Sequence, residues 1–486
     1  MSINPALLID GYKVDHRRQY PDGTQVIFSN MTARKTRRAE QPDMVFFGLQ
    51  YFIKEFLIEC WNKDFFHMPE DVVVGRFTQR INSYLGPNQV GEQHIYDLHK
   101  LGYLPLEIRA LPEGAVYPTK VPCLVVWNTD ERFFWITNYI ETILSAQLWG
   151  MCTSATTARQ YRLLLEQYAK ATVGNTSFVQ WQGHDFSFRG MFGLEAACMS
   201  GAGHLTSFTG TDTLPAIDFL VKYYGAEPSK ELVGGSVAAT EHSVMCAGGM
   251  DNEIGTFKRL INEVYPGGIV SIVSDSWDYW RVITEFTILL KQDILARDGK
   301  VVFRPDTGDP VKVVCGDPDA PEGSAEHKGS IECLWEIFGG STTPQGYKVL
   351  DPHVGLIYGD SITLQRARDI CEGLKSKGFA STNVVFGIGS YTYQYVTRDT
   401  DGFAVKATWA KVNGEEREIF KAPKTDDGTK KSAKGLTAVF KQEDRYYLKD
   451  QATWDEVLNC ALEPVFHNGI LLRDITLNEI RKTLYP

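Results

Sequence analysis

Two stretches decide the fold: Ile269-Val-Ser271-Ile-Val-Ser274-Asp275-Ser276 and Val301-Val-Phe303-Arg304-Pro305-Asp306-Thr307-Gly308. Each is a short apolar run, rich in β-branched residues, that ends in charged, small or glycine residues. Residues 279–295 lie between them and have the apolar spacing of a helix. A strand, a helix and a second strand in this order predict two parallel strands joined by a crossover helix.

The same pattern recurs through the middle of the chain, with a further helix expected over residues 363–377. Strand ends of a parallel barrel meet at one rim, and that rim holds the chemistry. We therefore predict an α/β protein whose residues 151–399 form an irregular (β/α) barrel-like catalytic domain. The other runs that end in polar or glycine residues are Phe178–Trp181, His204–Phe208, Val354–Tyr358 and Val384–Phe386.

The flanking parts, residues 1–150 and 400–486, have a different pattern and predict a mixed α+β domain. Asn413-Gly414 follows an alternating run and is a hairpin signal. The region 134–168 is helical in pattern and is expected as two helices broken near Gly150. The remaining elements expected here are strands at 26–32, 106–109, 121–127, 402–412 and 418–421 and a helix at 47–61.

Composition excludes several classes of protein. The 486 residues carry a formal charge of −10, which does not suit a nucleic-acid partner. No apolar run reaches the roughly 18 residues that span a bilayer, and the first 15 residues carry charges where a signal peptide has an apolar core. The nine cysteines are scattered without a CxxC pair, as in reduced thiols. We expect a cytoplasmic enzyme without a nucleic-acid or membrane partner.

The polar ends of the strands suit a phosphorylated ligand. Guanidinium groups bind phosphate oxygens bidentately, and Gly389-Ser390 after a strand can offer backbone N–H groups. Asp306 and Asp360 can hold sugar hydroxyls or, with substrate oxygens, Mg²⁺. Neither GxGxxG nor GxxxxGK[ST] occurs. The basic residues expected at the rim are Arg189, Arg304, Arg398 and Lys406.

His242 lies between Glu241 and Ser243 in a stretch of small residues. A histidine there can change protonation near neutral pH or carry a covalent group, although a packed helix start is the local alternative. Other candidates have structural alternatives too. Asp212 is a possible helix N-cap, Arg304 and Asp306 a structural ion pair, Phe186 and Tyr12 core aromatics, Arg398 a surface residue, and the loop 430–434 a solvated one.

Nine segments, in order along nearly the whole chain, resemble the nicotinamide phosphoribosyltransferases. This group is related to the nicotinate phosphoribosyltransferases and belongs to the type II phosphoribosyltransferases. The segments are Asp10-Gly-Tyr12-Lys-Val, Phe47-Gly-Leu-Gln-Tyr, His184-Asp-Phe-Ser-Phe-Arg189-Gly, Gly210-Thr-Asp212-Thr, Ser236–Ser243, Val273-Ser-Asp275-Ser, Arg304-Pro-Asp306-Thr-Gly, Gly359-Asp360 and Thr397-Arg398-Asp.

The resemblance implies transfer of 5-phosphoribosyl from its 1-pyrophosphate (PRPP) to nicotinamide, for NAD salvage. It implies that Tyr12 and Phe186 sandwich the pyridine ring and that Asp212 accepts the carboxamide N–H. It implies that ATP phosphorylates His242, that Asp275 orients this histidine and that Asp306 belongs with them as catalytic. The other substrate-binding positions implied are Arg189, Ser236, Ser271, Arg304, Gly359, Asp360, Gly389, Ser390, Arg398 and Lys406, with Asp10, Arg34, Lys430 and Ser432 for ATP or phosphate.

The resemblance further implies Mg²⁺ bound through the substrate pyrophosphate, with Asp306 or Asp360 as candidate ligands. It implies a homodimer in which Tyr12 reaches the partner's site. Gly389-Ser390 departs from the consecutive glycines that the family often has. Two alternatives remain: a nicotinate phosphoribosyltransferase, which a carboxylate at Asp212 disfavours, and a non-catalytic nucleotide-binding protein.

Overall fold

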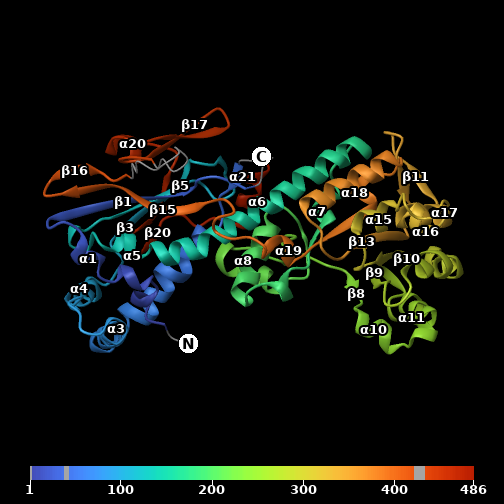
Figure 1. Ribbon diagram of the computed structural model, residues 1–486, viewed down its shortest axis with the longest axis horizontal. Helices are drawn as coiled ribbons and strands as arrows, with labels where there is room; N and C mark the ends of the chain where they lie inside the picture. The colour runs from blue at the N-terminus through green and yellow to red at the C-terminus, as the bar shows by residue number, and fades with distance from the viewer. Residues whose placement is uncertain (1–2, 38–42, 421–432) are drawn as a thin grey trace. The chain divides into compact units, whose positions relative to one another are not determined.

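The computed structural model describes residues 3–37, 43–420 and 433–486. These residues form two compact units (Figure 1). The first runs up to Thr156 and takes in Leu220–Ala226 and the chain from Thr397 onward; the second holds Thr157–Phe219 and Glu227–Val396. The expected division at 150 and 400 did not include Leu220–Ala226 in the first unit, because helical periodicity does not show which core a helix joins.

The second unit is built on a parallel sheet with the order β7-β6-β14-β13-β10-β9-β8. Its edges are brought together by a parallel bridge between Gly210 and Gly235. The α/β, barrel-like fold expected from the strand–helix alternation is therefore confirmed. Its strands are β6 Gly183–Asp185, β7 Gly210–Thr211, β8 Ala238–Ala239, β9 Gly267–Val273, β10 Asp298–Arg304, β13 Val354–Tyr358 and β14 Val384–Ile388.

Helices follow most of these strands, and Figure 1 shows α15, α17 and α18 around β13. In α18 (Leu364–Ser376), the Thr363 side chain caps the N-terminus, and the buried residues recur at helical spacing from Ala367 to Leu374. The expected helix at 279–295 forms as four consecutive pieces: α12 Tyr279–Arg281, η9 Val282–Phe286, α13 Thr287–Leu289 and α14 Lys291–Leu295.

The other elements of this unit are shorter or connect its strands. They are α7 Val179–Gln182, η6 Phe188–Gly190, α8 Leu194–Leu205, α10 His242–Ala247, η7 Met250–Asn252, α11 Glu253–Arg259, η8 Leu260–Val264, α15 Pro310–Cys315, α16 Ala325–Lys328, α17 Ser330–Phe338, β11 Gly340–Thr342, β12 Lys348–Leu350, η10 Ser381–Asn383 and α19 Ser390–Tyr393. Two longer helices, α6 Glu141–Thr172 and α9 Leu214–Tyr224, have residues in both units.

Three local expectations are wrong. Residues 204–208 begin in the last turn of α8, where His204 bonds to the carbonyl of Gly210, so the strand shrinks to two residues. Residues 179–182 form α7, and the strand starts only at Gly183. Helix α6 passes through Gly150 without a break, since a glycine inside a long, well-packed helix costs only about 1 kcal/mol.

The first unit contains a second seven-stranded sheet, in the order β16-β15-β1-β5-β3-β19-β20, with antiparallel pairs throughout. Asn413 and Gly414 both have positive φ, as the expected hairpin turn requires. The return strand, however, is Glu415–Glu418 rather than 418–421. The sheet's strands are β1 Thr24–Ala33, β3 Leu106–Ala110, β5 Pro122–Asn128, β15 Phe403–Val412, β16 Glu415–Glu418, β19 Glu463–His467 and β20 Ile470–Leu471.

The expected helix at 47–61 forms as α2 Leu49–Phe52 followed by the wider turns of η3 Ile53–Cys60. In the described residues, no helix is both long enough and apolar enough to cross a membrane. The remaining elements of the first unit are η1 Pro5–Leu7, η2 Gly11–Lys13, α1 His16–Gln19, β2 Asp43–Val45, η4 Asn62–Phe66, α3 Glu70–Leu85, α4 Gln93–Leu101, β4 Val116–Pro118, η5 Glu131–Phe133, α5 Ile136–Tyr139, β17 Ala438–Gln442, β18 Arg445–Lys449, α20 Trp454–Leu458 and α21 Leu477–Leu484.

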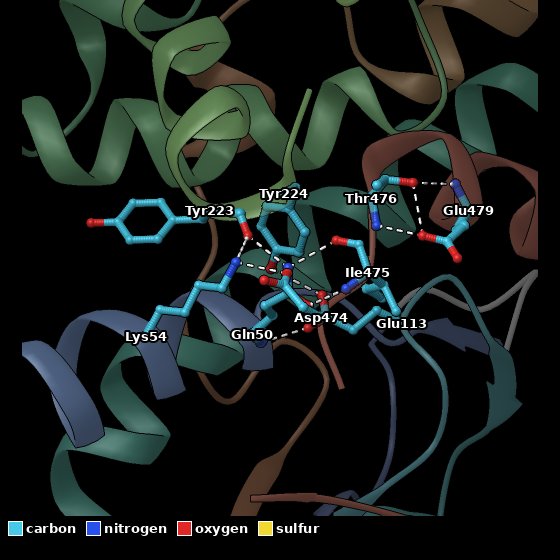
Figure 2. A network of polar contacts seen from close by, with 9 residues as sticks. All are labelled: Gln50, Lys54, Glu113, Tyr223, Tyr224, Asp474, Ile475, Thr476 and Glu479. Carbon is cyan, nitrogen blue, oxygen red and sulfur yellow. Dashed lines mark hydrogen bonds and ion pairs between the residues drawn. The ribbon is translucent and has the colours of Figure 1, made fainter. Parts of the chain in front are cut away.

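A network around Glu113 ties distant segments of the first unit together (Figure 2). The Glu113 carboxylate accepts hydrogen bonds from the backbone N–H groups of Gly48 and Gln50. It also accepts one from the hydroxyl of Tyr224, at the end of α9. The Gln50 side chain bonds to the backbone of Tyr223 and Ile475. Because a buried polar group without a partner is costly, these matched bonds fix where the end of α9 docks.

Candidate active site

A cavity of about 770 Å³ lies in the second unit, at the carboxyl ends of the parallel strands. Its walls are the turns that follow β6, β7, β10, β13 and β14, together with the start of α10. The sequence-predicted residues that line it are Phe186, Arg189, Asp212, His242, Arg304, Asp306, Gly359, Asp360, Gly389 and Ser390, and they are joined by Phe188, Thr213, Glu241, Ser243 and Tyr391. The polar ends of the strands therefore gather at one rim.

His242 is the first residue of α10, and its side chain is 46% exposed. Its Nε2 lies 3.1 Å from Oδ1 of Asp275, whose side chain is only 2% exposed. The other oxygen of Asp275 accepts hydrogen bonds from the Asp306 backbone N–H and the Thr307 hydroxyl, both at 2.8 Å. A buried carboxylate held on one side thus orients an exposed imidazole on the other, as in nucleophile–orienter pairs.

Arg304 ends strand β10 and Asp306 lies two residues beyond it, and the two side chains face each other without a close hydrogen bond. Arg304 Nε and Asp306 Oδ1 are 3.6 Å apart, and both atoms are buried without a hydrogen-bond partner among the described residues. Arg304 Nη2 donates to the Thr240 carbonyl at 2.8 Å, which fixes the guanidinium. Burial raises the pKa of Asp306, although Arg304 opposes this. Buried donors and acceptors left unpaired in this way are suited to ligand oxygens.

Gly359 is placed where a side chain cannot fit. A Cβ there would lie 1.9 Å from Asp306 Oδ1, so the chain can pass this carboxylate only as glycine. The residue after it, Asp360, is exposed at the same cavity. Among the described residues, no group of three or more His, Cys, Asp or Glu side chains is arranged to hold a metal ion.

Asp212 follows the short strand β7 and is bonded by two side chains. His184 Nε2 lies 2.9 Å and Ser236 Oγ 2.6 Å from its Oδ1. Burial would raise the pKa of Asp212, but these hydrogen bonds and the charge of Arg304 outweigh burial, so the pKa is lowered. The N-cap position of α9 falls on Thr213, since the helix begins at Leu214. The helix-cap alternative for Asp212 therefore does not describe its side chain.

A second cavity, of about 420 Å³, shares Phe186, Asp212 and Arg304 with the first. It runs among the barrel strands, past Ser236 and Ser271, toward Lys300 at the beginning of β10. Barrel interiors of this type are usually filled by branched side chains. Here branched residues such as Val302 and Ile357 are joined by the small residues Ala239 and Gly355, and a cavity remains.

Five predicted residues belong to the first unit. Tyr12 is 66% exposed, and Lys406 lies in β15. Asp10 accepts a hydrogen bond from Thr142, Arg34 donates to the Gly402 carbonyl, and Arg398 lies 3.6 Å from Asp399. The predictions for Lys430 and Ser432 lie outside the described residues.

Sequence reasoning assigned no role to several residues of the site, of which His184 and Tyr391 are two. His184 was part of a quoted motif, but only the fold shows that it bonds to Asp212, 28 residues away. Tyr391 lines the cavity beside Ser390 and is 56% exposed. Its position after a glycine-rich strand end was a signal that could have identified it.

Family models match most of the chain. Residues 4–108 match the nicotinamide phosphoribosyltransferase N-terminal domain, and residues 181–468 match the nicotinate phosphoribosyltransferase (NAPRTase) family. The chain is 56% identical to the nicotinamide phosphoribosyltransferase of Acinetobacter baylyi, over 99% of this chain and 97% of that protein. It is 34% identical to that of Xanthomonas campestris pv. campestris, over 98% and 97% of the two chains.

Solved structures share the fold at low identity. The nicotinate-nucleotide pyrophosphorylase of Pyrococcus furiosus matches with a TM-score of 0.58 at 14% identity, over 99% of this chain and 95% of that one. Human nicotinic acid phosphoribosyltransferase matches with a TM-score of 0.52 at 15% identity, over 98% and 93%. These likenesses support the mixed α/β architecture with its curled parallel sheet.

Proposed function

The chain belongs to the nicotinamide phosphoribosyltransferases of the nicotinate phosphoribosyltransferase family, and on that premise we propose that it makes nicotinamide mononucleotide. The pyridine nitrogen of nicotinamide attacks C1 of PRPP. The bond from C1 to the pyrophosphate oxygen breaks, and pyrophosphate leaves with the electron pair. The product supplies NAD synthesis, so the reaction is a salvage step.

The Asp212 carboxylate at the cavity is the observation that favours nicotinamide over nicotinate as the substrate. It lies in the same cavity as Phe186, whose ring can stack on a flat heterocycle. A carboxamide donates N–H to a carboxylate, whereas a nicotinate carboxylate has no donor and is repelled by the like charge. The lowered pKa of Asp212 keeps this group ionised near neutral pH.

The leaving pyrophosphate requires positive charge in place before the reaction. Arg304 has a buried Nε without a hydrogen-bond partner among the described residues, and Arg189 lines the same cavity. Fixed cations of this kind stabilise charge that develops on a leaving group.

We assign Gly389 and Ser390 to the 5′-phosphate, and Asp306, Gly359 and Asp360 to the ribose. Mg²⁺ would be held by substrate oxygens together with Asp306 or Asp360, because this ion is usually bound by one or two carboxylates plus phosphate oxygens. The bound ion would neutralise negative charge on the pyrophosphate.

ATP coupling is a separate part of the proposal. Because Asp275 can only accept a hydrogen bond, Nε2 of His242 carries the proton, and the lone pair lies on Nδ1. Nδ1 forms the bond to the γ-phosphorus of ATP while the bond to the ADP oxygen breaks. Water later cleaves the N–P bond and releases phosphate. His242 lines the cavity and its side chain is 46% exposed, which supports this role.

We also propose a homodimer that acts in the cytoplasm. Tyr12 is largely exposed, as a ring that reaches a partner's ligand must be. Phe192, at 88%, and Tyr395, at 79%, are exposed as well, and such apolar surface suits an interface between two copies. All nine cysteines, each among the described residues, are free, which fits a reducing compartment.

One assay tests the proposal. The purified protein is incubated with PRPP, Mg²⁺ and either nicotinamide or nicotinate, with and without ATP, and the mononucleotide and pyrophosphate are measured. We expect nicotinamide mononucleotide, a large preference for the amide and stimulation by ATP. Better use of nicotinate would overturn the substrate assignment, and no product from either substrate would favour a non-catalytic role. Sedimentation tests the dimer, which a fully active monomer would contradict.

A further inference from the structure

His184 and Ser236 both bond to the same oxygen of Asp212. Oδ1 lies 2.9 Å from His184 Nε2 and 2.6 Å from Ser236 Oγ. An ionised carboxylate oxygen has about two acceptor positions, so Oδ1 is fully used by the protein. Oδ2 is then the oxygen that a ligand in the cavity can reach.

Of the two donors, His184 is the rigid one. It lies in β6, which pairs with β14 on one side and β7 on the other, and it is only 8% exposed. Ser236 is exposed, and its hydroxyl can rotate about the Cβ–Oγ bond. An exposed hydroxyl that can rotate fixes a carboxylate less firmly than a buried ring does.

Two neighbours confine the imidazole of His184. The Phe186 ring centroid lies 4.7 Å from that of His184. A Cβ at position 210 would lie 2.7 Å from Nδ1, so the ring fits only because residue 210 is glycine. Since the Asp212 carboxylate accepts but does not donate, Nε2 carries the proton in this hydrogen bond.

We propose that His184 is a positioning residue that holds the Asp212 carboxylate with Oδ2 toward the ligand and so makes the site select a carboxamide over a carboxylate. The inference rests on the proposed function, because it concerns the ring substituent of the acceptor substrate. A carboxylate in a fixed orientation meets the amide N–H at full strength and repels an acid. When the carboxylate can rotate, it loses both effects, because hydrogen-bond strength falls steeply with misalignment.

Two substitutions of similar size and polarity separate positioning from packing. In His184→Gln, the amide nitrogen can reach the place of Nε2 and donate to Asp212. In His184→Asn, the side chain is one carbon shorter and cannot. The measurements are kcat and KM for nicotinamide and nicotinate at saturating PRPP, and KM for PRPP.

We expect His184→Asn to raise KM for nicotinamide about tenfold and to lower the amide-to-acid ratio of kcat/KM about tenfold or more, the scale of one misplaced hydrogen bond. The kcat for nicotinamide and the KM for PRPP should change less than about threefold. His184→Gln should keep the ratio within about threefold of the wild type. Calorimetric titration with nicotinamide alone measures its Kd for the wild type and both His184 variants, and so compares them without turnover.

His94→Gln is the matched control. His94 is also buried, burial lowers its pKa to about 3, and it belongs to the first unit. The amide-to-acid ratio of kcat/KM in His94→Gln should equal that of the wild type. If neither His184 variant folds, Gly210→Ala tests the same point, since the new methyl group displaces the imidazole while His184 remains.

Equal loss of the ratio in His184→Gln and His184→Asn would overturn the proposal, because packing alone would then explain it. An unchanged ratio in folded His184→Asn would overturn it too. The wild-type ratio reports on the proposed function, whereas the difference between the Gln and Asn variants reports on His184. The two failures are therefore distinguishable.

Discussion

Glu113 in the first unit and Asp212 in the second are both carboxylates held by hydrogen-bond donors, but only Glu113 has both oxygens occupied. Oε1 of Glu113 accepts from the Gln50 N–H at 2.6 Å, and Oε2 accepts from the Gly48 N–H and the Tyr224 hydroxyl. Figure 2 shows Glu113 beside Gln50 and Tyr224. The two donors to Asp212 share Oδ1, and the side chain is 44% exposed at a cavity. A closed network stabilises a fold, whereas a network left open on one side can bind a ligand.

Burial of the carboxylate alone does not distinguish a structural network from one that serves a binding site. The Asp275 side chain is 2% exposed and Glu113 is 6% exposed. Asp275 nevertheless orients His242, which lines the cavity. What distinguishes a site is that the chain of hydrogen bonds ends at a space that another molecule can fill.

The largest effect is expected for Glu113→Ala. The substitution leaves two backbone N–H groups and the Tyr224 hydroxyl buried without an acceptor, so we expect the free energy of unfolding to fall by about 4 kcal/mol. Urea unfolding measures this loss. The amide-to-acid ratio of the folded fraction should not change; a changed ratio with normal stability would show that the Glu113 network is not purely structural.

Asp212→Ser should change the amide-to-acid ratio and leave the stability almost unchanged, the opposite of Glu113→Ala. Without the charge, nicotinate is no longer repelled, and we expect the amide-to-acid ratio of kcat/KM to fall about a hundredfold. The free energy of unfolding should stay within about 1 kcal/mol of the wild type, because the residue is half exposed. Steady-state kinetics with both substrates measures the ratio. A stability loss as large as that of Glu113→Ala would remove the distinction drawn between the two carboxylates.

His242→Ala should lose the stimulation by ATP, which we expect to be about tenfold, yet retain basal transfer. The reason is that the pyridine nitrogen, not the histidine, is the nucleophile of the transfer. Initial rates with and without ATP measure the effect, and radiolabelled phosphate should no longer bind to the protein. Complete loss of transfer at saturating substrates would contradict this separation of roles.

The smallest expected effect is in the dependence of stability on pH, where the two carboxylates have opposite signs. Burial raises the pKa of Glu113, so its charge costs stability at neutral pH, and this cost is relieved as pH falls through the folded-state pKa. The pKa of Asp212 is lowered, so its contribution is present at neutral pH and is lost as pH falls through the folded-state pKa.

Unfolding from about pH 7 to about pH 2, a range that passes the ordinary pKa of free carboxyls near 4, measures this contrast. The wild type should gain stability relative to Glu113→Gln as the pH falls. The advantage that it has over Asp212→Asn should persist down to about pH 4 and shrink below that pH. Parallel trends in the two comparisons would show that both carboxylates lie in equivalent surroundings.

The sequence alone determined the parallel strands, the barrel-like class and the rim at which Arg304, Asp306 and Asp360 meet. It could do so because strand and helix periodicities are local, and because parallel strands place their carboxyl ends on one side. The antiparallel sheet and the Asn413-Gly414 hairpin followed from equally local signals. The strand expected at 204–208 failed, since the buried contacts of His204 outweighed its local propensity for strand.

Only the tertiary structure decided which polar groups are satisfied and which are left for a ligand. The pairing of His184 with Asp212, the open position on that carboxylate and the unpartnered Nε of Arg304 depend on residues far apart in the chain. So does the docking of Tyr224 against Glu113. Hydrogen bonding is directional and short in range, so a site of this kind exists only once the fold has brought its donors and acceptors within about 3 Å.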